Sequence, residues 1–265
     1  MKEFEKLIEI METLRGPAGC PWDREQTPED LKACLLEETY EVLDAIDKSD
    51  PLFLREELGD LLLQIVFLSQ MAREKGDFQI RDVVLQITQK LVRRHPHVFA
   101  GAKLETSGEV LNQWERIKSR EREAAGSFLL DGTPAALPAL LRAFRLASKA
   151  SHVGFDWESA DGAFEKVEEE FTELREVLSG KVNRDRMCHE LGDLMFALAN
   201  LSRHLEVNPE EALQQANRRF HSRFTHMEKS LRAEGRQVSE ADPAELETLW
   251  ESAKEAESKK KNVQK

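Results

Sequence analysis

The sequence predicts an all-α protein built from two related helical halves. Apolar residues recur three and four positions apart over most of the 265 residues, and the alternation typical of β-strands is scarce. A pattern of carboxylates also occurs twice, as Glu37-Glu38-x-x-Glu41 with Glu57-x-x-Asp60 and as Glu169-Glu170-x-x-Glu173 with Glu190-x-x-Asp193. Repetition over so long an interval indicates tandem domains rather than a short-period solenoid.

Start and stop signals divide each half into helices. Thr27-Pro28 predicts an N-cap followed by proline at the first helical position. Asp50-Pro51 separates the two acidic helices of the first half, and Ser179-Gly180 separates their counterparts. The expected helices are 4–14, 28–47, 52–75 and 80–94, followed by 137–150, 160–179, 184–205, 209–234 and 243–257.

Matched landmarks lie at nearly constant separations in the two halves. Trp22 and Trp157 are 135 residues apart, and Trp114 and Trp250 are 136 apart. Between the halves lies a stretch interrupted by Gly and Pro, which favours a linker. We expect an N-terminal domain over 1–120, a linker over 121–136, a C-terminal domain over 137–257 and a basic, frayed tail over 258–265.

The composition argues against several classes of protein. A net charge of −12 and a sequence pI of about 5.2 disfavour nucleic acid as the main ligand, since backbone binding needs a basic surface. The chain has no apolar run long enough for a bilayer and no signal-peptide pattern, so no membrane association is expected. The three cysteines have neither metal-site spacing nor a disulfide framework. A cytoplasmic location follows as an expectation.

The carboxylates are expected on the apolar faces of their helices. At 100° per residue, Glu38 and Glu41 lie about 60° apart and share a side with Leu35 and Val42. Buried carboxylates are unfavourable unless a partner neutralises them, and an all-oxygen set suits a hard divalent cation. The predicted metal ligands are Glu170, Glu173, Glu190 and Asp193, with Glu38, Glu41, Glu57 and Asp60 as candidates in the first copy.

Two other interpretations account for the acidic pattern less well. A di-iron carboxylate protein would carry Glu-x-x-His on two helices, whereas here the second element is Glu-x-x-Asp. A helical scaffold with degenerate acidic sets would be expected to have lost carboxylates, yet both four-residue sets are complete. A metal-dependent enzyme is therefore the preferred interpretation.

Several longer segments resemble one family. They are GCPWDREQT at 19–27, RRHPHVF at 93–99, LPALLRAFRLASKASHVGFDW at 137–157 and ANRRFHSRF at 216–224. Together with the duplicated acidic pattern, they make the chain similar to MazG-type nucleoside triphosphate pyrophosphohydrolases over nearly its whole length. The resemblance implies tandem duplicated helical domains, with four-helix-bundle-type packing completed by homodimerisation.

The same resemblance implies an activity. It predicts hydrolysis of NTPs or dNTPs, ATP included, to the monophosphate and diphosphate with Mg²⁺, for which Mn²⁺ can substitute. In this chemistry a metal-activated water attacks the α-phosphorus while cations stabilise the departing diphosphate. Glu169 lies beside the apolar stripe and is the candidate general base, although the sequence does not distinguish it from Glu170.

Basic residues distinguish the two copies. Lys166 and Arg186 stand where the first half has Cys34 and Phe53. Aligning ANRRFHSRF with KLVRRHPHVF pairs Arg219 with Arg94 and Arg223 with Val98. Since phosphate binding needs cations, we expect the main active site in the C-terminal half. The predicted nucleotide-binding residues are Lys166, Arg186, Arg219, Arg223, Trp250 and Lys254.

Structural or outer-contact roles are predicted for three histidines and the two remaining tryptophans. His189 adjoins Glu190 but lies about 100° from the metal face, so it is expected to be an outer contact. His95 and His97 flank a proline, and a structural role in that loop is preferred. Trp22 and Trp157 are likewise expected to be structural.

Overall fold

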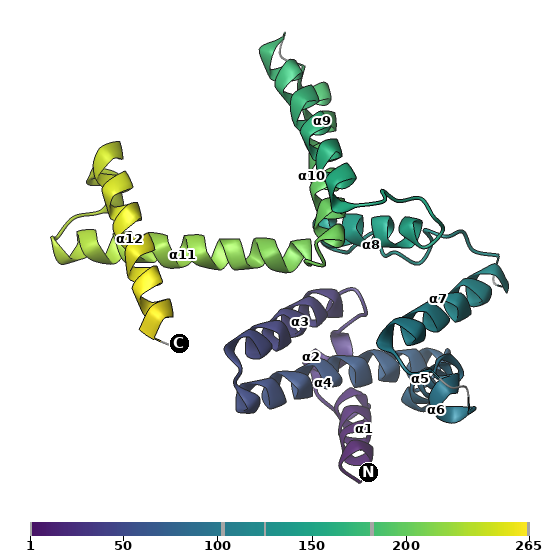
Figure 1. Cartoon of the computed structure of the whole chain (residues 1–265). Coiled ribbons are helices and arrows are strands. Elements are labelled where there is room, and N and C mark those ends of the chain that lie inside the picture. Colours follow the sequence, from purple (N-terminus) through teal and green to yellow (C-terminus); the bar gives the residue numbers. More distant parts are fainter. Residues whose placement is uncertain (1, 102–103, 125, 181–182, 264–265) are drawn as a thin grey trace. The chain divides into compact units, whose positions relative to one another are not determined.

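The computed structural model of the chain describes residues 2–101, 104–124, 126–180 and 183–263. Every regular element within these ranges is a helix, which confirms the predicted all-α fold (Figure 1). The chain divides into two compact units, Met1–Lys118 and Ser119–Lys265. The division lies close to residue 120, the predicted end of the N-terminal domain. No helix in the described ranges has the length and apolar character needed to cross a membrane.

Unit 1 is organised around the packing of α3 on α4. A core of Met11, Leu31, Val66, Phe67 and Met71 joins α1 to these two helices. The guanidinium of Arg15 donates to both carboxylate oxygens of Glu74, at 2.8 and 2.7 Å, and so ties α1 to the end of α4. The helices are α1 Lys2–Arg15, α2 Pro21–Glu25, α3 Leu31–Lys48, α4 Pro51–Lys75, α5 Ile80–Arg94, α6 Pro96–Phe99 and α7 Ser107–Ala124.

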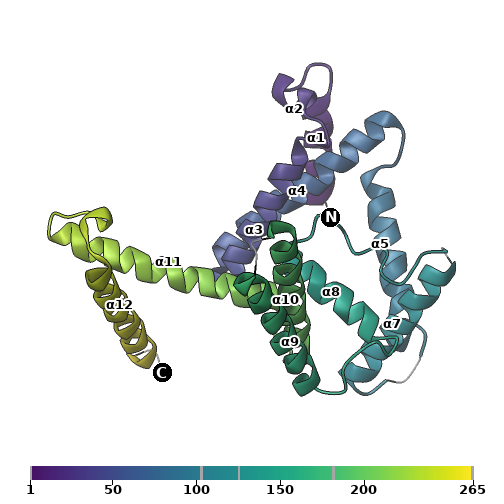
Figure 2. The same cartoon turned by 90° about the horizontal axis from the view of Figure 1, so that it is seen from above.

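Unit 2 repeats the acidic helix pair as α9 and α10. These two helices form its largest packing interface, α8 packs on α10, and α12 packs on α11 (Figures 1 and 2). The helices are α8 Ala139–Ser151, α9 Ala160–Ser179, α10 Arg184–His204, α11 Pro209–Ala233 and α12 Pro243–Val263, with a short 3-10 helix at Val238–Glu240.

Both helices that carry the Glu-x-x-Asp element begin with a capping side chain. Asp50 accepts hydrogen bonds from the backbone N–H groups of Leu52 and Phe53 at the start of α4. Asn183 accepts two equivalent bonds from Asp185 and Arg186 at the start of α10. Each cap satisfies amide groups that have no partner within the helix. The caps fix where these helices start, and hence the register of the carboxylates they carry.

The structure corrects four details of the expected elements. Residues 28–30 form a turn in which the Thr27 N–H and hydroxyl donate to Asp30, so α3 begins at Leu31 and Thr27 is not its N-cap. The helices α2, α6 and α7 were not expected, because two are short and the charged stretch around Trp114 has few apolar residues. Helix α7 also extends to Ala124 into the expected linker. Helix α12 continues to Val263, so the basic tail is helical beyond Ser258.

Candidate active site

The acidic side chains of α9 and α10 converge in unit 2. Oxygen atoms of Glu170, Glu173 and Glu190 all lie within 4.8 Å of one another. Glu170 and Glu190 are only 6% and 7% exposed, although both are glutamates, while Glu173 is exposed at the rim. Two buried carboxylates at this spacing repel each other strongly unless positive charge lies between or beside them.

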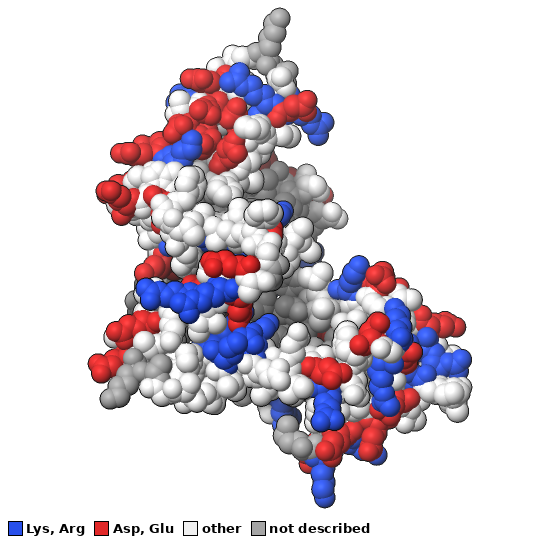
Figure 3. All heavy atoms as spheres, turned by 90° about the vertical axis from the view of Figure 1, so that its right-hand side faces the viewer, with Lys and Arg blue, Asp and Glu red and all other residues white. Residues whose placement is uncertain are grey.

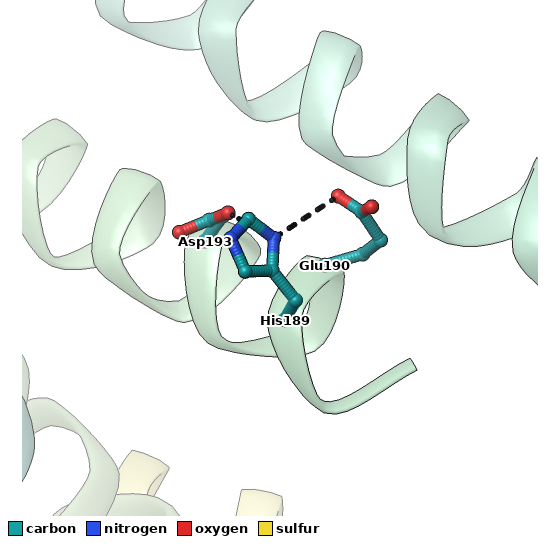
Figure 4. A group of neighbouring side chains, drawn as sticks. All are labelled: His189, Glu190 and Asp193. Carbon is teal, nitrogen blue, oxygen red and sulfur yellow. Dashed lines mark ion pairs between the residues drawn. The ribbon is translucent and has the colours of Figure 1, made fainter. Parts of the chain in front are cut away.

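Asp193 joins the cluster through a histidine. The Nδ1 atom of His189 lies 3.0 Å from a carboxylate oxygen of Asp193 and 3.9 Å from one of Glu190. Figure 4 shows the imidazole ring between these two carboxylates. An atom from each of the three side chains lies within 4.8 Å of the other two. Glu190 thus belongs to both groups and connects the four predicted ligands of this half.

Two cations neutralise part of this charge. The ammonium of Lys166 lies 2.8 Å from Glu169 and 2.7 Å from Glu170. Hydrogen bonds to these two carboxylates raise the pKa of Lys166 above its ordinary value, so it remains charged. The guanidinium of Arg186 lies 3.6 Å from Glu190. Both basic residues predicted to lie near the second acidic set are therefore beside it.

The negative charge that remains in the cluster affects the pKa of Glu173. Although Glu173 as a whole is exposed, loss of solvent around its carboxylate, followed by repulsion from Glu170 and Glu190, raises its pKa above that of a free glutamate. The anionic form of this side chain is thus unfavourable until another positive charge is present. The donor set is all carboxylate oxygen, with one imidazole beside it, and two of its members are buried. These properties fit a hard divalent cation.

Unit 1 contains a corresponding cluster between α3 and α4. Oxygen atoms of Glu38, Glu57 and Asp60 lie within 4.8 Å of one another, and Glu57 is 7% exposed. Burial and then repulsion from Asp60 and Glu41 raise the pKa of Glu38, and burial with repulsion from Glu41 and Asp60 does the same for Glu57. Glu41 is exposed and acts on the cluster through its charge. Three of the four first-copy candidates are thus close together, and Glu41 is not in that group.

The other predicted nucleotide-binding residues lie on α11 and α12. The guanidinium carbon of Arg223 lies 5.6 Å from the ring centre of Trp250, and Arg223 also pairs with Glu257 at 2.9 Å. The ring centres of Phe220 and Trp250 lie 5.4 Å apart. Lys254 pairs with Glu251 at 2.7 Å, and Arg219 is exposed. The structure thus brings Arg223 and Trp250 together on α11 and α12, and no ion pair or ring contact joins Lys254 or Arg219 to this pair among the described residues.

The matching group in unit 1 corrects one alignment made from the sequence. The guanidinium carbon of Arg94 lies 5.4 Å from the ring centre of Trp114, as Arg223 lies over Trp250. By this contact Arg94 corresponds to Arg223 and not to Arg219, so Val98 is not the counterpart of Arg223. The contrast between the halves therefore depends on Lys166 opposite Cys34 and on Arg186 opposite Phe53. The two aligned segments share Arg-Arg, but α5 ends at Arg94 whereas α11 continues to Ala233, so the alignment paired the wrong residues.

The histidines differ from each other in their environments. The His95 ring packs edge-on against Trp114 at 4.8 Å, and its Nδ1 lies 2.7 Å from the carbonyl oxygen of Leu91. His189 contacts Asp193 and its side chain is exposed, which is the position of an outer contact beside a predicted ligand. The four-residue spacing from 189 to 193 brings these two helical side chains together.

The loop before α9 is held by a charged group. Arg203 donates to Asp156, and His204 Nε2 lies 3.0 Å from the same carboxylate oxygen. Trp157 packs so closely on Gly162 that a Cβ there would lie 2.9 Å from the indole. These contacts attach the loop to α9 and α10, as expected for a structural tryptophan.

Charged side chains are mixed on the surface drawn in Figure 3. Lys and Arg lie beside Asp and Glu on this face, and uncharged areas separate the charged groups. The face shown has no continuous basic surface of the kind that phosphate backbones need.

Comparisons with known proteins give a consistent result. The family model described as "MazG nucleotide pyrophosphohydrolase domain" matches residues 26–99, a range that contains the carboxylate cluster of unit 1. The nucleoside triphosphate pyrophosphohydrolase/pyrophosphatase MazG of Thermotoga maritima is 45% identical over 251 residues, which cover 95% of this chain and 95% of that protein. The nucleoside triphosphate pyrophosphohydrolase of Escherichia coli K12 is 45% identical over 260 residues, covering 97% and 99%.

One solved structure is also similar. The crystal structure of a mazG-related protein from Thermotoga maritima covers 43% of this chain and 98% of its own, with 29% sequence identity and a TM-score of 0.38.

Proposed function

The chain belongs to the MazG family of nucleoside triphosphate pyrophosphohydrolases, and on this basis we propose that the cluster of α9 and α10 is its hydrolytic centre. The observation that carries the proposal is the pair of cations beside that cluster. Lys166 lies within 2.8 Å of two carboxylates and Arg186 within 3.6 Å of a third. A triphosphate carries several negative charges, so an acidic site needs both metal and basic side chains to hold it.

The side chains of this centre would have three roles, namely metal binding, phosphate binding and proton transfer. Glu170, Glu173, Glu190 and Asp193 would hold Mg²⁺ or Mn²⁺. The bound cation would neutralise phosphate oxygens and make an attacking water more acidic. Lys166 and Arg186 would turn from the carboxylates to the phosphate oxygens, since both have long, flexible stems. Glu169, held by Lys166 at the exposed edge, would accept the proton of the attacking water.

The aromatic group on α11 and α12 would contact the nucleoside. The Trp250 ring has Phe220 at 5.4 Å and the Arg223 guanidinium at 5.6 Å. A base can stack on such a surface through its π-face, whatever its hydrogen-bonding edge. Lys254 and Arg219 would add positive charge nearby. This arrangement suits several NTPs and dNTPs rather than one base.

The bond that is broken provides the test of this function. We expect a nucleoside monophosphate and diphosphate as the first products, because water attacks the α-phosphorus. Chromatography of the nucleotides formed during early turnover of ATP and dATP would identify them. Release of a nucleoside diphosphate with orthophosphate as first products would contradict the proposal.

We also propose that the chain forms a homodimer. The α3–α4 and α9–α10 pairs each provide two helices, whereas a four-helix layer needs four. Large apolar side chains remain exposed on both pairs, among them Leu43 and Ile46 on α3 and Phe171 and Leu178 on α9. Large apolar side chains left exposed on both helix pairs are available for an association interface.

Sedimentation tests the dimer. The wild-type chain should sediment as a dimer at micromolar concentration, and Leu43→Glu with Leu178→Glu should shift it towards the monomer because both place a charge on the apolar faces. Phe128→Ser is the control, since this side chain is 81% exposed but lies outside both helix pairs. A wild-type monomer at this concentration would contradict the dimer.

A further inference from the structure

Helices α11 and α12 carry the predicted nucleoside contacts away from the carboxylates of their own unit. Helix α11 follows α10 after a short connection at 205–208, and α12 packs on α11. Neither α9 nor α10 is among the helices that α12 packs against in the described part of unit 2. Figures 1 and 2 both show α11 running away from α9 and α10, with α12 beside its far part. The pair of Arg223 and Trp250 therefore lies apart from the carboxylate cluster of α9 and α10.

The two groups nevertheless occupy matching positions on their helices. Asp193 lies eleven residues before the last residue of α10, and Phe220 lies eleven residues after the first residue of α11. Glu190 and Arg223 each lie fourteen residues from the same two ends. At a rise of 1.5 Å per residue, these separations are about 17 and 21 Å along each helix. An α11 helix that lay antiparallel to α10 would bring the two groups level, but within one chain the two helices diverge.

Helix α10 has an uncovered apolar surface beside its carboxylates. Phe196 lies one turn after Asp193 and about 60° from it around the helix, so the two side chains face the same side. Phe196 also lines a hollow together with Phe155 and Trp157, and all three aromatic side chains are exposed. Exposed aromatic groups gathered in this way are typical of an interaction surface.

Helix α11 has a matching uncovered stripe. Leu213, Phe220 and Phe224 are seven and four residues apart, so they share one face of the helix, and all three are exposed. The rings of Phe220 and Phe224 stack with their centres 6.0 Å apart. Arg219 and Arg223 lie on the same helix within one turn of Phe220. Helix α11 thus presents arginines next to aromatic rings, whereas α10 presents carboxylates next to aromatic rings.

The carboxylates of the cluster outnumber the cations that pair with them among the described residues. Lys166 and Arg186 lie beside a group of five acidic side chains, which are Glu169, Glu170, Glu173, Glu190 and Asp193. The α11 helix of a second copy is complementary to this site both in charge and in its aromatic surface. Because the two copies are identical, one exchange of this helix completes both sites through the same contacts.

We propose that two copies of the chain exchange α11 and α12, so that Arg223 and Trp250 of one copy complete the nucleotide site at the α9–α10 carboxylates of the other. The inference rests on the proposed function and on the homodimer. Antiparallel contact between α11 of one copy and α10 of the other sets Phe220 against Phe196 and brings Arg223 level with the carboxylates. Each site then takes its metal ligands from one copy and its nucleoside contacts from the second, and a monomer contains no complete site.

Mixed dimers of two impaired variants test the exchange. Glu170→Gln removes a carboxylate of the cluster and Arg223→Ala removes a cation of α11, so each variant alone should have its kcat/KM for ATP lowered by about tenfold or more. The two variants are co-expressed with different affinity tags, and the mixed dimer is purified through both tags. If the sites are shared, one of its two sites combines an intact cluster with an intact α11, and the mixed dimer should regain about half of the wild-type activity. If each chain builds its own site, both sites contain a substitution and no activity returns.

The matched control is a mixed dimer of Glu170→Gln with Asp193→Asn. Both substitutions lie in the cluster, so this dimer contains no intact site in either arrangement and should stay as impaired as its parents. Activity in the first mixed dimer but not in the control would assign the recovery to α11 of the other copy.

A second readout does not depend on hydrolysis. Phe224→Glu on α11 and Phe196→Glu on α10 should each weaken the dimer by about tenfold or more in sedimentation, because both place a charge in the proposed contact. A dimer affinity within twofold of wild type for both variants, with circular dichroism showing intact helices, would overturn the exchange. An active wild-type dimer whose mixed dimer of Glu170→Gln and Arg223→Ala regains no activity would overturn it as well, and would leave the proposed function in place. An inactive wild type would contradict the proposed function alone, and sedimentation would still decide the exchange.

Discussion

Removing divalent cations is expected to abolish hydrolysis of nucleoside triphosphates. Glu170 and Glu190 are buried, and desolvation followed by repulsion from both raises the pKa of Glu173, so without a cation the cluster repels a polyanion. Lys166 and Arg186 alone cannot offset that repulsion, because the carboxylates already hold them. Turnover should therefore fall by at least about a hundredfold, the scale of a lost electrostatic stabiliser. Added Mg²⁺ or Mn²⁺ should restore it.

The measurement is a rate in excess EDTA, followed by titration with each ion. Circular dichroism of the same sample serves as the control, since the helices pack through apolar cores such as that of Met11, Val66 and Met71 and should remain without metal. A chelated sample with unchanged helical content and no activity would assign the loss to the site. Undiminished turnover after exhaustive chelation would refute a metal-dependent mechanism.

Chelation should also lower thermal stability, with a pH dependence that follows from the carboxyl groups. The pKa values of Glu38, Glu57 and Glu173 are raised in the folded chain by burial and then by neighbouring carboxylates. The unfolded chain loses these protons first as the pH rises, so the stability of the metal-free fold falls from their ordinary pKa up to their raised folded pKa and stays low above it. A bound cation favours the charged forms and should reverse the trend.

Helical periodicity was sufficient to predict most of the fold. The expected helix 80–94 coincides with α5, and 160–179 coincides with α9, because both have strong periodicity and clear ends. Helix α7 was missed because its apolar residues are few and the stretch around it is highly charged. The turn at 28–30 was missed because Thr27 and Asp30 bond to each other, which satisfies the same groups that an N-cap would.

The candidate site was predictable where one helix face contains all the information. Glu170 and Glu190 lie on apolar stripes, and both are buried as the pattern predicted. The contact between Arg223 and Trp250 could not be predicted from the sequence, because it depends on how α11 packs on α12. The sequence also could not predict that the buried Oε1 atom of Gln64 has no hydrogen-bond partner among the described residues. The partners of a glutamine on an apolar stripe are decided by tertiary packing.

The central claim is that hydrolysis takes place in unit 2, and paired substitutions in the two clusters test it most directly. Glu170→Gln and Asp193→Asn each remove a charged oxygen ligand from the cluster that has Lys166 and Arg186 beside it. Glu38→Gln and Asp60→Asn make the same chemical changes in the cluster of unit 1. Side-chain volume is nearly unchanged in all four variants, so differences in rate report on the charge that is lost.

The measurement is kcat/KM for ATP with saturating Mg²⁺ in each of the four variants. We expect Glu170→Gln and Asp193→Asn to lower it by about a hundredfold or more, and Glu38→Gln and Asp60→Asn to lower it by less than about tenfold. Equal losses in the two pairs would mean that both units hydrolyse the triphosphate, and a larger loss in unit 1 would place the reaction there. Either result would contradict the assignment drawn from Lys166 and Arg186.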